Sequence, residues 1–273
     1  MQMAVCFHSH NRIVEAMESY NYLRQNFPDF AFPLVNIALI ELKNGNSRKV
    51  IQTLNLYFQE VGGMFGNITK NDYDAKTVGP PCLPHAVNRL ECVNALNFYG
   101  IAHVELYNYE KALISYERAI EIGFDVHLIS DVFQNMGTLY NVLGNYDEAA
   151  NSFLKSFWFS IQMKDDIDPT PLIQRAMLIP SISSSLEDSI LWKKRFQKRV
   201  HDLMKLIEHG GAGWVDDEGD IFKIQEGVSS IDNIKALQVS VLFFNMKLLI
   251  MIVLHFTDLL SLISSPSQEP LDI

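Results

Sequence analysis

Small and aromatic residues recur at fixed steps in the middle of the chain. Gly100, Ala112, Tyr116 and Ala119 are separated by steps of twelve, four and three residues. The helical period places the last three on one face of a helix, and a preceding helix carries the glycine. Where two antiparallel helices cross closely, one side must be small, and an aromatic residue one turn away fills the remaining space. The same steps predict a second helical hairpin, through Gly137, Ala149, Phe153 and Ser156.

A partial copy of this pattern lies near the N-terminus. Ala16, Tyr20 and Leu23 keep the second-helix steps, and Pro28 follows where it would stop the helix. Ala4 falls at the small first-helix position, with only a stub of helix before it. We therefore expect the repeat to begin before the first residue, so that the chain is clipped at its front.

A further partial copy follows. Ala38 lies thirty-four residues after Ala4, and Val50 stands where the clearer copies have a small residue, so the fit is weaker. The remaining positions of this copy are Leu34 and Ile37 on its first helix, Gly45-Asn46 in its turn and Leu54 on its second helix.

These spacings resemble the tetratricopeptide repeat family, whose unit is a helix-turn-helix of thirty-four residues. The resemblance implies an all-α fold, a superhelical solenoid of helical hairpins whose first helices line a concave groove. It also implies a scaffold for protein or peptide partners, and it implies no chemistry and no cofactor.

The pattern divides the chain into five parts. Glycine and proline interrupt the helical periodicity between the second and third copies, which predicts an insertion there. The parts are partial units in 1–58, the insertion or loop in 59–92, two clear units in 93–163, a linker and amphipathic helix in 164–210, and an acidic turn, apolar helix and tail in 211–273.

Extra helices are expected after the repeats. Thr170 with Pro171 can begin a helix running to about Pro180. The run Ser185 to Asp188 resembles a capping box and predicts a longer helix ending near His209. Its apolar stripe should pack on the end of the solenoid, and its basic face should be solvated. The stripe is Phe196, Val200, Leu203, Met204 and Ile207, and the basic face is Lys193, Lys194, Lys198 and Arg199.

The last part of the chain is acidic and then apolar. We expect an acidic turn from Trp214 to Gly219, and we reject a calcium loop because Gly227 stands where an acidic twelfth ligand is needed. Residues 239–263 are apolar but are interrupted by Lys247 and Asp258, among other polar residues. A buried closing helix is favoured for this segment, with a membrane helix and a poorly folding tail as alternatives.

Composition narrows the partners and the compartment. A formal net charge of −10 argues against nucleic-acid binding, which needs a basic surface. The three cysteines leave an odd thiol, so we expect no disulfide framework and an intracellular protein of the cytoplasm or nucleus. Cys6, His8 and His10 are two residues apart and point to different sides of a helix, so no metal site is expected.

A narrower resemblance begins after the repeats. The order of residues looks like the linker between the repeats and the catalytic region of SPINDLY-type, O-linked N-acetylglucosamine transferase-like proteins. However, residues 211–273 are too few for the sugar-nucleotide-binding domains and contain no Gly-rich phosphate loop. We therefore expect no catalytic residues and no catalysis by this chain alone. The matching residues are Arg175 to Ile182, Ser185 to Asp188, Trp192, Arg195 and Phe196.

The resemblance to that transferase family also indicates candidate groove residues, because the family places Asn at a recurring inner position to hold a peptide backbone. An amide suits this task since it offers both donors and acceptors. Asn36 and Asn135 stand at that position, and Phe98 departs from the pattern. Asn97, Gln134 and Asn141 stand at inner positions where chaperone-tail-binding repeats carry Lys or Arg, and they complete the candidate groove set.

Three functional hypotheses follow. The leading one is a non-catalytic scaffold that binds an extended peptide or protein partner through the concave groove. The first alternative is a truncated transferase-like glycosyltransferase whose repeat region recognises protein substrates. The second alternative is an adaptor tethered to a membrane through residues 239–263.

Overall fold

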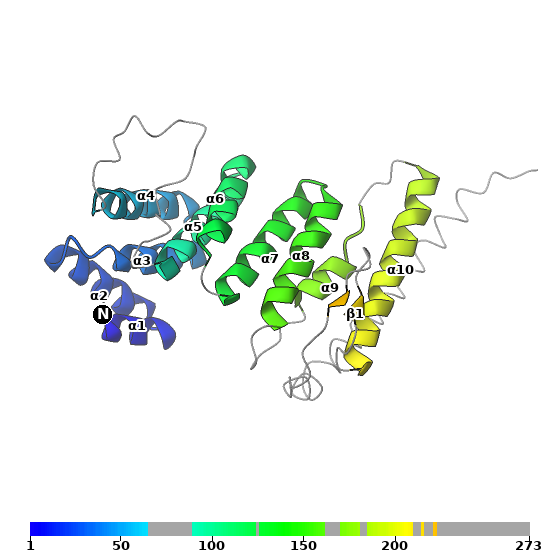
Figure 1. Ribbon diagram of the computed structural model, residues 1–273. Coiled ribbons are helices and arrows are strands. Elements are labelled where there is room, and N and C mark those ends of the chain that lie inside the picture. The colour runs from blue at the N-terminus through cyan, green and yellow to red at the C-terminus, as the bar shows by residue number, and fades with distance from the viewer. Residues whose placement is uncertain are drawn as a thin grey trace, which may run out of the picture. The chain divides into compact units, whose positions relative to one another are not determined.

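The computed structural model describes residues 1–64, 89–123, 126–161, 170–180, 185–209, 214–215 and 221–222 (Figure 1). Two compact units are distinguished, Met1–His209 and Gly210–Ile273. The described residues of the first unit are helical apart from short turns and loops, which confirms the all-α class. The second unit contributes a short strand pair.

The helices of the first unit pair into antiparallel hairpins. α1 pairs with α2, α3 with α4, α5 with α6 and α7 with α8, and the second helix of each hairpin also contacts the first helix of the next. The first helices α3, α5 and α7 contact one another in series. The bounds are α1 Gln2–Ser9, α2 Ile13–Asn26, α3 Phe32–Lys43, α4 Ser47–Met64, α5 Arg89–Glu105, α6 Tyr109–Ile122, α7 Val126–Val142, α8 Tyr146–Ile161, α9 Thr170–Ala176 and α10 Leu186–His209.

The two clear hairpins are closed by a ring packed directly on a glycine. A Cβ atom added at Gly100 would lie 2.4 Å from Cε1 of Tyr116, and one added at Gly137 would lie 2.7 Å from Cδ1 of Phe153. Both distances are shorter than any ordinary carbon contact. The predicted crossing of small and aromatic residues is therefore confirmed in both hairpins.

The two partial hairpins use the same register. Ala4 and Ala38 stand at the glycine position, and every small or ring position of all four hairpins is almost fully buried. The second-helix residues at these positions are Ala16 and Tyr20, Val50 and Leu54, Ala112 and Tyr116, and Ala149 and Phe153, each at most 2% exposed.

The four turns share a backbone feature that the sequence pattern reveals only in part. The residue seven places after the small position has a positive φ in each hairpin: Asn11, Gly45, Tyr107 and Gly144. In each turn, the next N–H donates to the carbonyl five residues before it, as Asn108 does to His103 at 2.8 Å. These are Schellman turns, which favour glycine. The glycine signal is present at two of the turns and absent at the other two.

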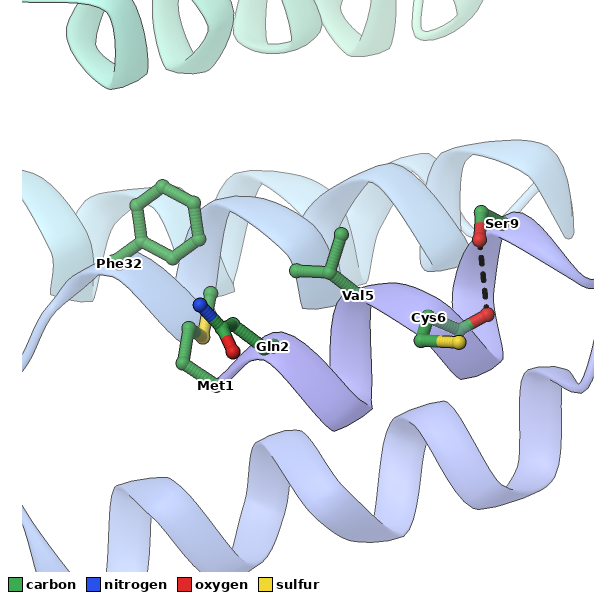
Figure 2. A pocket seen from close by; sticks show the side chains of 6 residues that line it. All are labelled: Met1, Gln2, Val5, Cys6, Ser9 and Phe32. Atoms are coloured by element: carbon green, nitrogen blue, oxygen red, sulfur yellow. Dashed lines mark hydrogen bonds between the residues drawn. The ribbon is translucent and has the colours of Figure 1, made fainter.

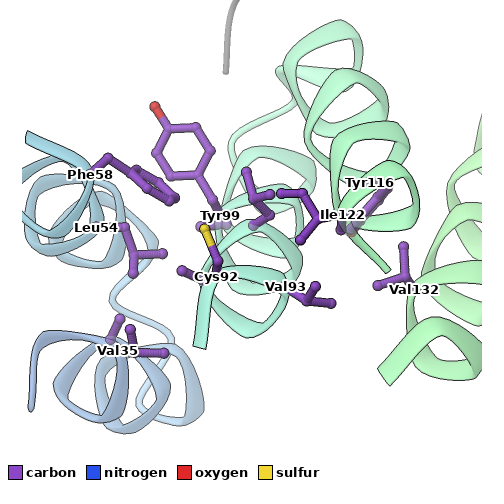
Figure 3. Packing of buried hydrophobic residues seen from close by; sticks show 14 of the residues in the cluster. Val35, Leu54, Phe58, Cys92, Val93, Tyr99, Tyr116, Ile122 and Val132 are labelled. Carbon is purple, nitrogen blue, oxygen red and sulfur yellow. The ribbon is translucent and has the colours of Figure 1, made fainter. Parts of the chain in front are cut away.

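A continuous core joins the second, third and fourth hairpins. Leu54 and Phe58 of α4 lie against Tyr99 of α5, and Val93 and Tyr116 lie toward Val132 of α7 (Figure 3). The rings of Phe58 and Tyr99 meet edge to face, with their centroids 5.6 Å apart. The first hairpin packs on α3 through a smaller cluster, formed by Ala4, Ala16, Tyr20, Ile37 and Ile40.

Cysteine pairing corrects one expectation. Cys92 is buried on α5 and disulfide-bonded, and its partner lies outside the described residues. Cys6 is free and exposed. The expectation of no disulfide framework therefore misses one bridge, because an odd cysteine count leaves one thiol over without preventing the others from pairing.

Several predicted boundaries shift. α4 continues to Met64 and α5 begins at Arg89, so both ends of the interval 59–92 are helical, and residues 65–88 lie outside the described part. α9 ends at Ala176, short of Pro180, because the residue before a proline is disfavoured in helical conformation.

The long helix α10 packs on α9, and it contacts α8 through two of its side chains. Of its predicted apolar stripe, Phe196 and Val200 are buried. The N–H of Asp188 donates to Oγ of Ser185 at 3.1 Å, which confirms the N-terminal cap. Trp192 meets Tyr146 edge to face at 5.3 Å between ring centroids. Arg195 forms an ion pair with Asp147 of α8 at 3.2 Å. The side chains of Leu203, Met204 and Ile207 lie outside the described residues.

The prediction that the basic face of α10 is solvated is wrong for one of its residues. Arg199 is only 5% exposed, whereas Lys194 and Lys198 are exposed. Arg199 follows Trp192 by two helical turns, so both lie on the face that packs on the neighbouring helices. The guanidinium carbon lies 6.0 Å from the Trp192 ring centroid.

The predicted acidic turn begins as a strand instead. In the second unit, β1 Trp214–Val215 pairs antiparallel with β2 Ile221–Phe222. Trp214 stands opposite Phe222, and Val215 stands opposite Ile221. Such aromatic and β-branched pairs favour strand pairing. The remaining residues of the expected turn and the apolar segment 239–263 lie outside the described residues. Among the helices that the structure describes, none has the length and apolar character needed to cross a membrane.

We predict that Gly100→Ala destabilises the protein although alanine favours helices. Overpacking a core costs about 1–3 kcal/mol, and the gain in helix propensity is about 1 kcal/mol. The net loss in the free energy of unfolding should be up to about 2 kcal/mol in urea denaturation. In a Tyr116→Leu background the same change should cost less, because the ring is gone. An equal cost in both backgrounds would show that the clash is not with Tyr116.

A second prediction concerns the turn at Tyr107, whose φ is 60°. A left-handed conformation costs a residue with a Cβ about 1–2 kcal/mol relative to glycine. Tyr107→Gly should therefore raise the free energy of unfolding by about 0.5–1 kcal/mol after loss of the ring contact with Tyr109. Tyr107→Ala is the matched control, since it removes the ring and keeps the Cβ. Stabilisation by both variants would contradict the backbone explanation.

Candidate functional site

The candidate groove residues lie on the first helices of the hairpins. Asn36 is on α3, Asn97 is on α5, and Gln134, Asn135 and Asn141 are on α7. We call these five residues the amide face. The helices α3, α5 and α7, which carry these residues, contact one another in series.

Two members of the amide face form a hydrogen bond with each other across the contact between α5 and α7. Nδ2 of Asn135 donates to Oδ1 of Asn97 at 2.8 Å. Asn97 is only 5% exposed, whereas Asn135 is partly exposed. The structure therefore assigns the two amides different roles: Asn97 is buried between α5 and α7, and it holds the Asn135 side chain in one orientation.

A second hydrogen bond between amide side chains links the amide face to a helix that follows the repeats. Nε2 of Gln134 donates to Oε1 of Gln174 at 3.0 Å. Gln174 belongs to α9, which packs on α8 after the last hairpin. Sequence reasoning did not select Gln174, although the start signal at Thr170 and Pro171 had identified its helix.

Asn36 and Asn141, the other two members of the amide face, take no part in these two hydrogen bonds. Nδ2 of Asn36 donates to the carbonyl of Phe32 in its own helix at 3.5 Å, a long hydrogen bond. Asn141 is exposed near the C-terminus of α7. Among the described residues, no hydrogen bond links Asn36 or Asn141 to the other three.

The helices α5 and α7 carry more acid than base. Their sequences contain Glu91, Glu105 and Asp131 against the single basic side chain of Arg89, apart from histidines. Oγ of Ser47 donates to Glu105, so this carboxylate also ties α5 to the start of α4. An acidic ligand would meet little positive charge here.

An apolar depression lies between α1 and the start of α3 (Figure 2). It encloses about 360 Å³ and opens to solvent. Phe32 forms one wall and is one helical turn from Asn36, so the depression adjoins the amide face. Within the described ranges, no group of three or more His, Cys, Asp or Glu side chains could hold a metal ion. The other lining residues are Met1, Gln2, Val5, Cys6 and Ser9.

One buried titratable group lies on α5. His103 is 3% exposed, and neither ring nitrogen has a hydrogen-bond partner. The Tyr99 ring stands edge-on to it at 4.5 Å between centroids. Burial, and then the charge of Lys111, lower the pKa of His103 to about 4. The side chain is therefore neutral at pH 7 and acts as a core residue.

A scan against protein-family models and a search of curated protein sequences find no match to this chain. The family resemblance therefore stands on the residues of the chain itself.

We predict that His103 makes stability fall in mild acid. Its pKa is lowered to about 4 on folding from the ordinary 6.5, so the unfolded state binds the proton first. Stability should be full above pH 6.5, should fall by about 2–3 kcal/mol between pH 6.5 and 4, and should lose nothing more from this group below pH 4. Urea denaturation at several pH values measures the slope.

The control variants for this test are His103→Leu and His201→Gln. His103→Leu should flatten the slope, because no buried imidazole remains to be charged. His201 is exposed on α10, so its replacement should leave the slope unchanged. A slope retained in His103→Leu would assign the acid sensitivity to other groups.

Proposed function

We propose that this chain is a non-catalytic helical-repeat scaffold that binds an extended peptide segment of a protein partner along the amide face. The observation that carries this proposal is the hydrogen bond from Asn135 to the buried Asn97. This bond orients the side chain of Asn135 on α7. The O-linked N-acetylglucosamine transferase-like family, which the chain resembles, uses an Asn at the corresponding position to bind the backbone of a peptide.

Amide chemistry supports an extended peptide as the ligand. An Asn side chain has two N–H donors and an oxygen with two lone pairs. The bond to Asn97 uses one N–H of Asn135, so its carbonyl oxygen and second N–H are not consumed by that bond. A peptide bond presents one donor and one acceptor, which such an amide can match.

Fixed orientation should favour binding. A free amide side chain loses rotamer entropy when it binds a ligand, at a cost of about 0.5–1.5 kcal/mol per side chain. Asn97 and Gln174 hold Asn135 and Gln134 before any ligand arrives. We infer that these two residues position the contacting amides, while Asn135, Gln134 and Asn141 contact the peptide.

The charge of α5 and α7 indicates which peptides are disfavoured. With Glu91, Glu105 and Asp131 on these helices, a peptide rich in acidic residues would be repelled. The expected ligand is therefore neutral or basic and is recognised mainly through its backbone.

The test uses a phage-displayed library of random linear peptides selected on the full chain. The strongest selected peptide is synthesised, and its affinity is measured by calorimetry. Asn135→Ala combined with Asn141→Ala should weaken binding about tenfold or more, because two amide hydrogen bonds of about 1 kcal/mol each are lost. Circular dichroism checks that the variant stays folded.

Asn151→Ala is the matched control, since Asn151 is an exposed amide on α8, the second helix of the same hairpin. This variant should bind the peptide as tightly as the parent protein. The proposal fails if the library yields no specific peptide, or if the double variant binds as well as the parent.

A further inference from the structure

Four polar atoms converge at the last turn of α1. Sγ of Cys6 and Nδ1 of His10 lie 3.7 Å apart. Nδ1 also lies 2.9 Å from the carbonyl oxygen of Cys6 and 3.3 Å from Oγ of Ser9. The three side chains are exposed, so a small solute can reach these atoms from solvent. We call the four atoms the α1 cluster, and each of them can offer a lone pair to a cation.

The helical period explains why the cluster forms. Cys6 and His10 are four residues apart, which places them on the same face of the helix. Residues two apart point to different sides, and this holds for His8, whose ring meets the buried Tyr20 at 6.4 Å between centroids. The spacing of two therefore excludes His8 from the cluster and does not exclude the pair of Cys6 and His10.

Hydrogen bonding leaves Nδ1 of His10 available as a ligand atom. The carbonyl oxygen of Cys6 accepts the backbone N–H of His10 at 3.1 Å and the hydroxyl of Ser9 at 2.9 Å (Figure 2). A carbonyl oxygen has two lone pairs, so these two donors already satisfy it without a proton from Nδ1. When the imidazole carries its proton on Nε2 instead, Nδ1 presents a lone pair to the cluster.

The separation of sulfur and nitrogen fits a shared zinc ion. Zinc binds sulfur at about 2.3 Å and imidazole nitrogen at about 2.0–2.1 Å, and the tetrahedral angle then places the two ligand atoms about 3.6 Å apart. The observed separation is 3.7 Å. The cluster lies at the C-terminal end of α1, where the helix dipole favours a cation. Arg12, the next cation along the chain, is paired with Glu15 at 2.8 Å.

We propose that Cys6 and His10 form a surface site for Zn²⁺, with the Cys6 thiolate and Nδ1 of His10 as its ligands. On binding, the thiol releases its proton to water, and sulfur and nitrogen each donate a lone pair to the metal, with no change of oxidation state. Among the described residues no group of three or more His, Cys, Asp or Glu side chains could hold a metal ion. The site therefore uses two such side chains and is completed by oxygen atoms, of Ser9, the Cys6 carbonyl or water.

The small number of strong ligands sets the character of the site. Structural zinc sites have four protein ligands and hold the metal permanently. A site with one thiolate and one imidazole should bind zinc reversibly, and the chain should fold without it. The amide face lies on other helices, so the metal site and the peptide groove are independent.

The experiment titrates the full chain with Co²⁺, without a reducing agent, so that the disulfide of Cys92 stays closed. Cobalt takes the same kinds of ligand as zinc, and a cobalt–thiolate bond gives a charge-transfer absorption band in the near ultraviolet. This band should grow to saturation with increasing Co²⁺. Addition of Zn²⁺ should remove it, because zinc competes for the same atoms.

Three variants locate the metal. Cys6→Ser should abolish the band, because the sulfur that produces it is gone. His10→Ala should weaken cobalt binding about tenfold or more, since even residues that only support a metal ligand contribute that much. His8→Ala is the matched control and should bind cobalt as tightly as the parent, because the His8 ring is turned toward Tyr20. Circular dichroism checks that each variant stays folded.

Three outcomes would overturn the proposal. The first is the absence of a saturable charge-transfer band. The second is a band that Cys6→Ser retains, which would place the metal at another thiol. The third is equal affinity in His10→Ala and the parent, which would show binding by the thiol alone. Asn135→Ala combined with Asn141→Ala should leave the band unchanged, so failure of the metal site and failure of the peptide groove are distinguishable.

Discussion

The contact of an aromatic ring with a glycine backbone sets the geometry on which the rest of the first unit depends. Tyr116 lies where any side chain at Gly100 would be, and Phe153 does the same at Gly137. Such contacts fix how closely the two helices of a hairpin approach. With that spacing fixed, the residues one before and two after the small position fall on the side where the preceding hairpin packs. The core and the line of first helices follow from this register.

The sequence pattern predicted the hairpins well because close packing restricts residue type. Only glycine or alanine fits at the small position, so the step pattern is visible in the amino-acid sequence. The turns are less visible, because a Schellman turn is closed by backbone hydrogen bonds and can impose a left-handed residue against its preference. At Asn11 and Tyr107 no glycine marks the left-handed position, so the sequence did not reveal these two turns. The burial of Arg199 was missed because the arginine lies among lysines in sequence and under Trp192 in space.

The candidate site was predictable only at the level of residue type. An amide at an inner position can bind a ligand or another amide of the protein, and both uses need the same donors and acceptors. The structure places Asn97 in the second use and leaves Asn141 exposed. Gln174 shows the converse case. Its helix was predicted, but its partner Gln134 is forty residues away and could be found only from the packing of α9 on the last hairpin.

The contact between α4 and α5 shows what keeps the hairpins in phase. The small positions Ala38 and Gly100 are much farther apart in sequence than Ala4 and Ala38, yet Tyr99 of α5 packs on Phe58 of α4, and Ser47 donates to Glu105. Contacts between neighbouring helices, rather than the length of connecting chain, hold the spatial period. Segments of very different length can therefore be accommodated at this junction without shifting the alignment of the hairpins that follow.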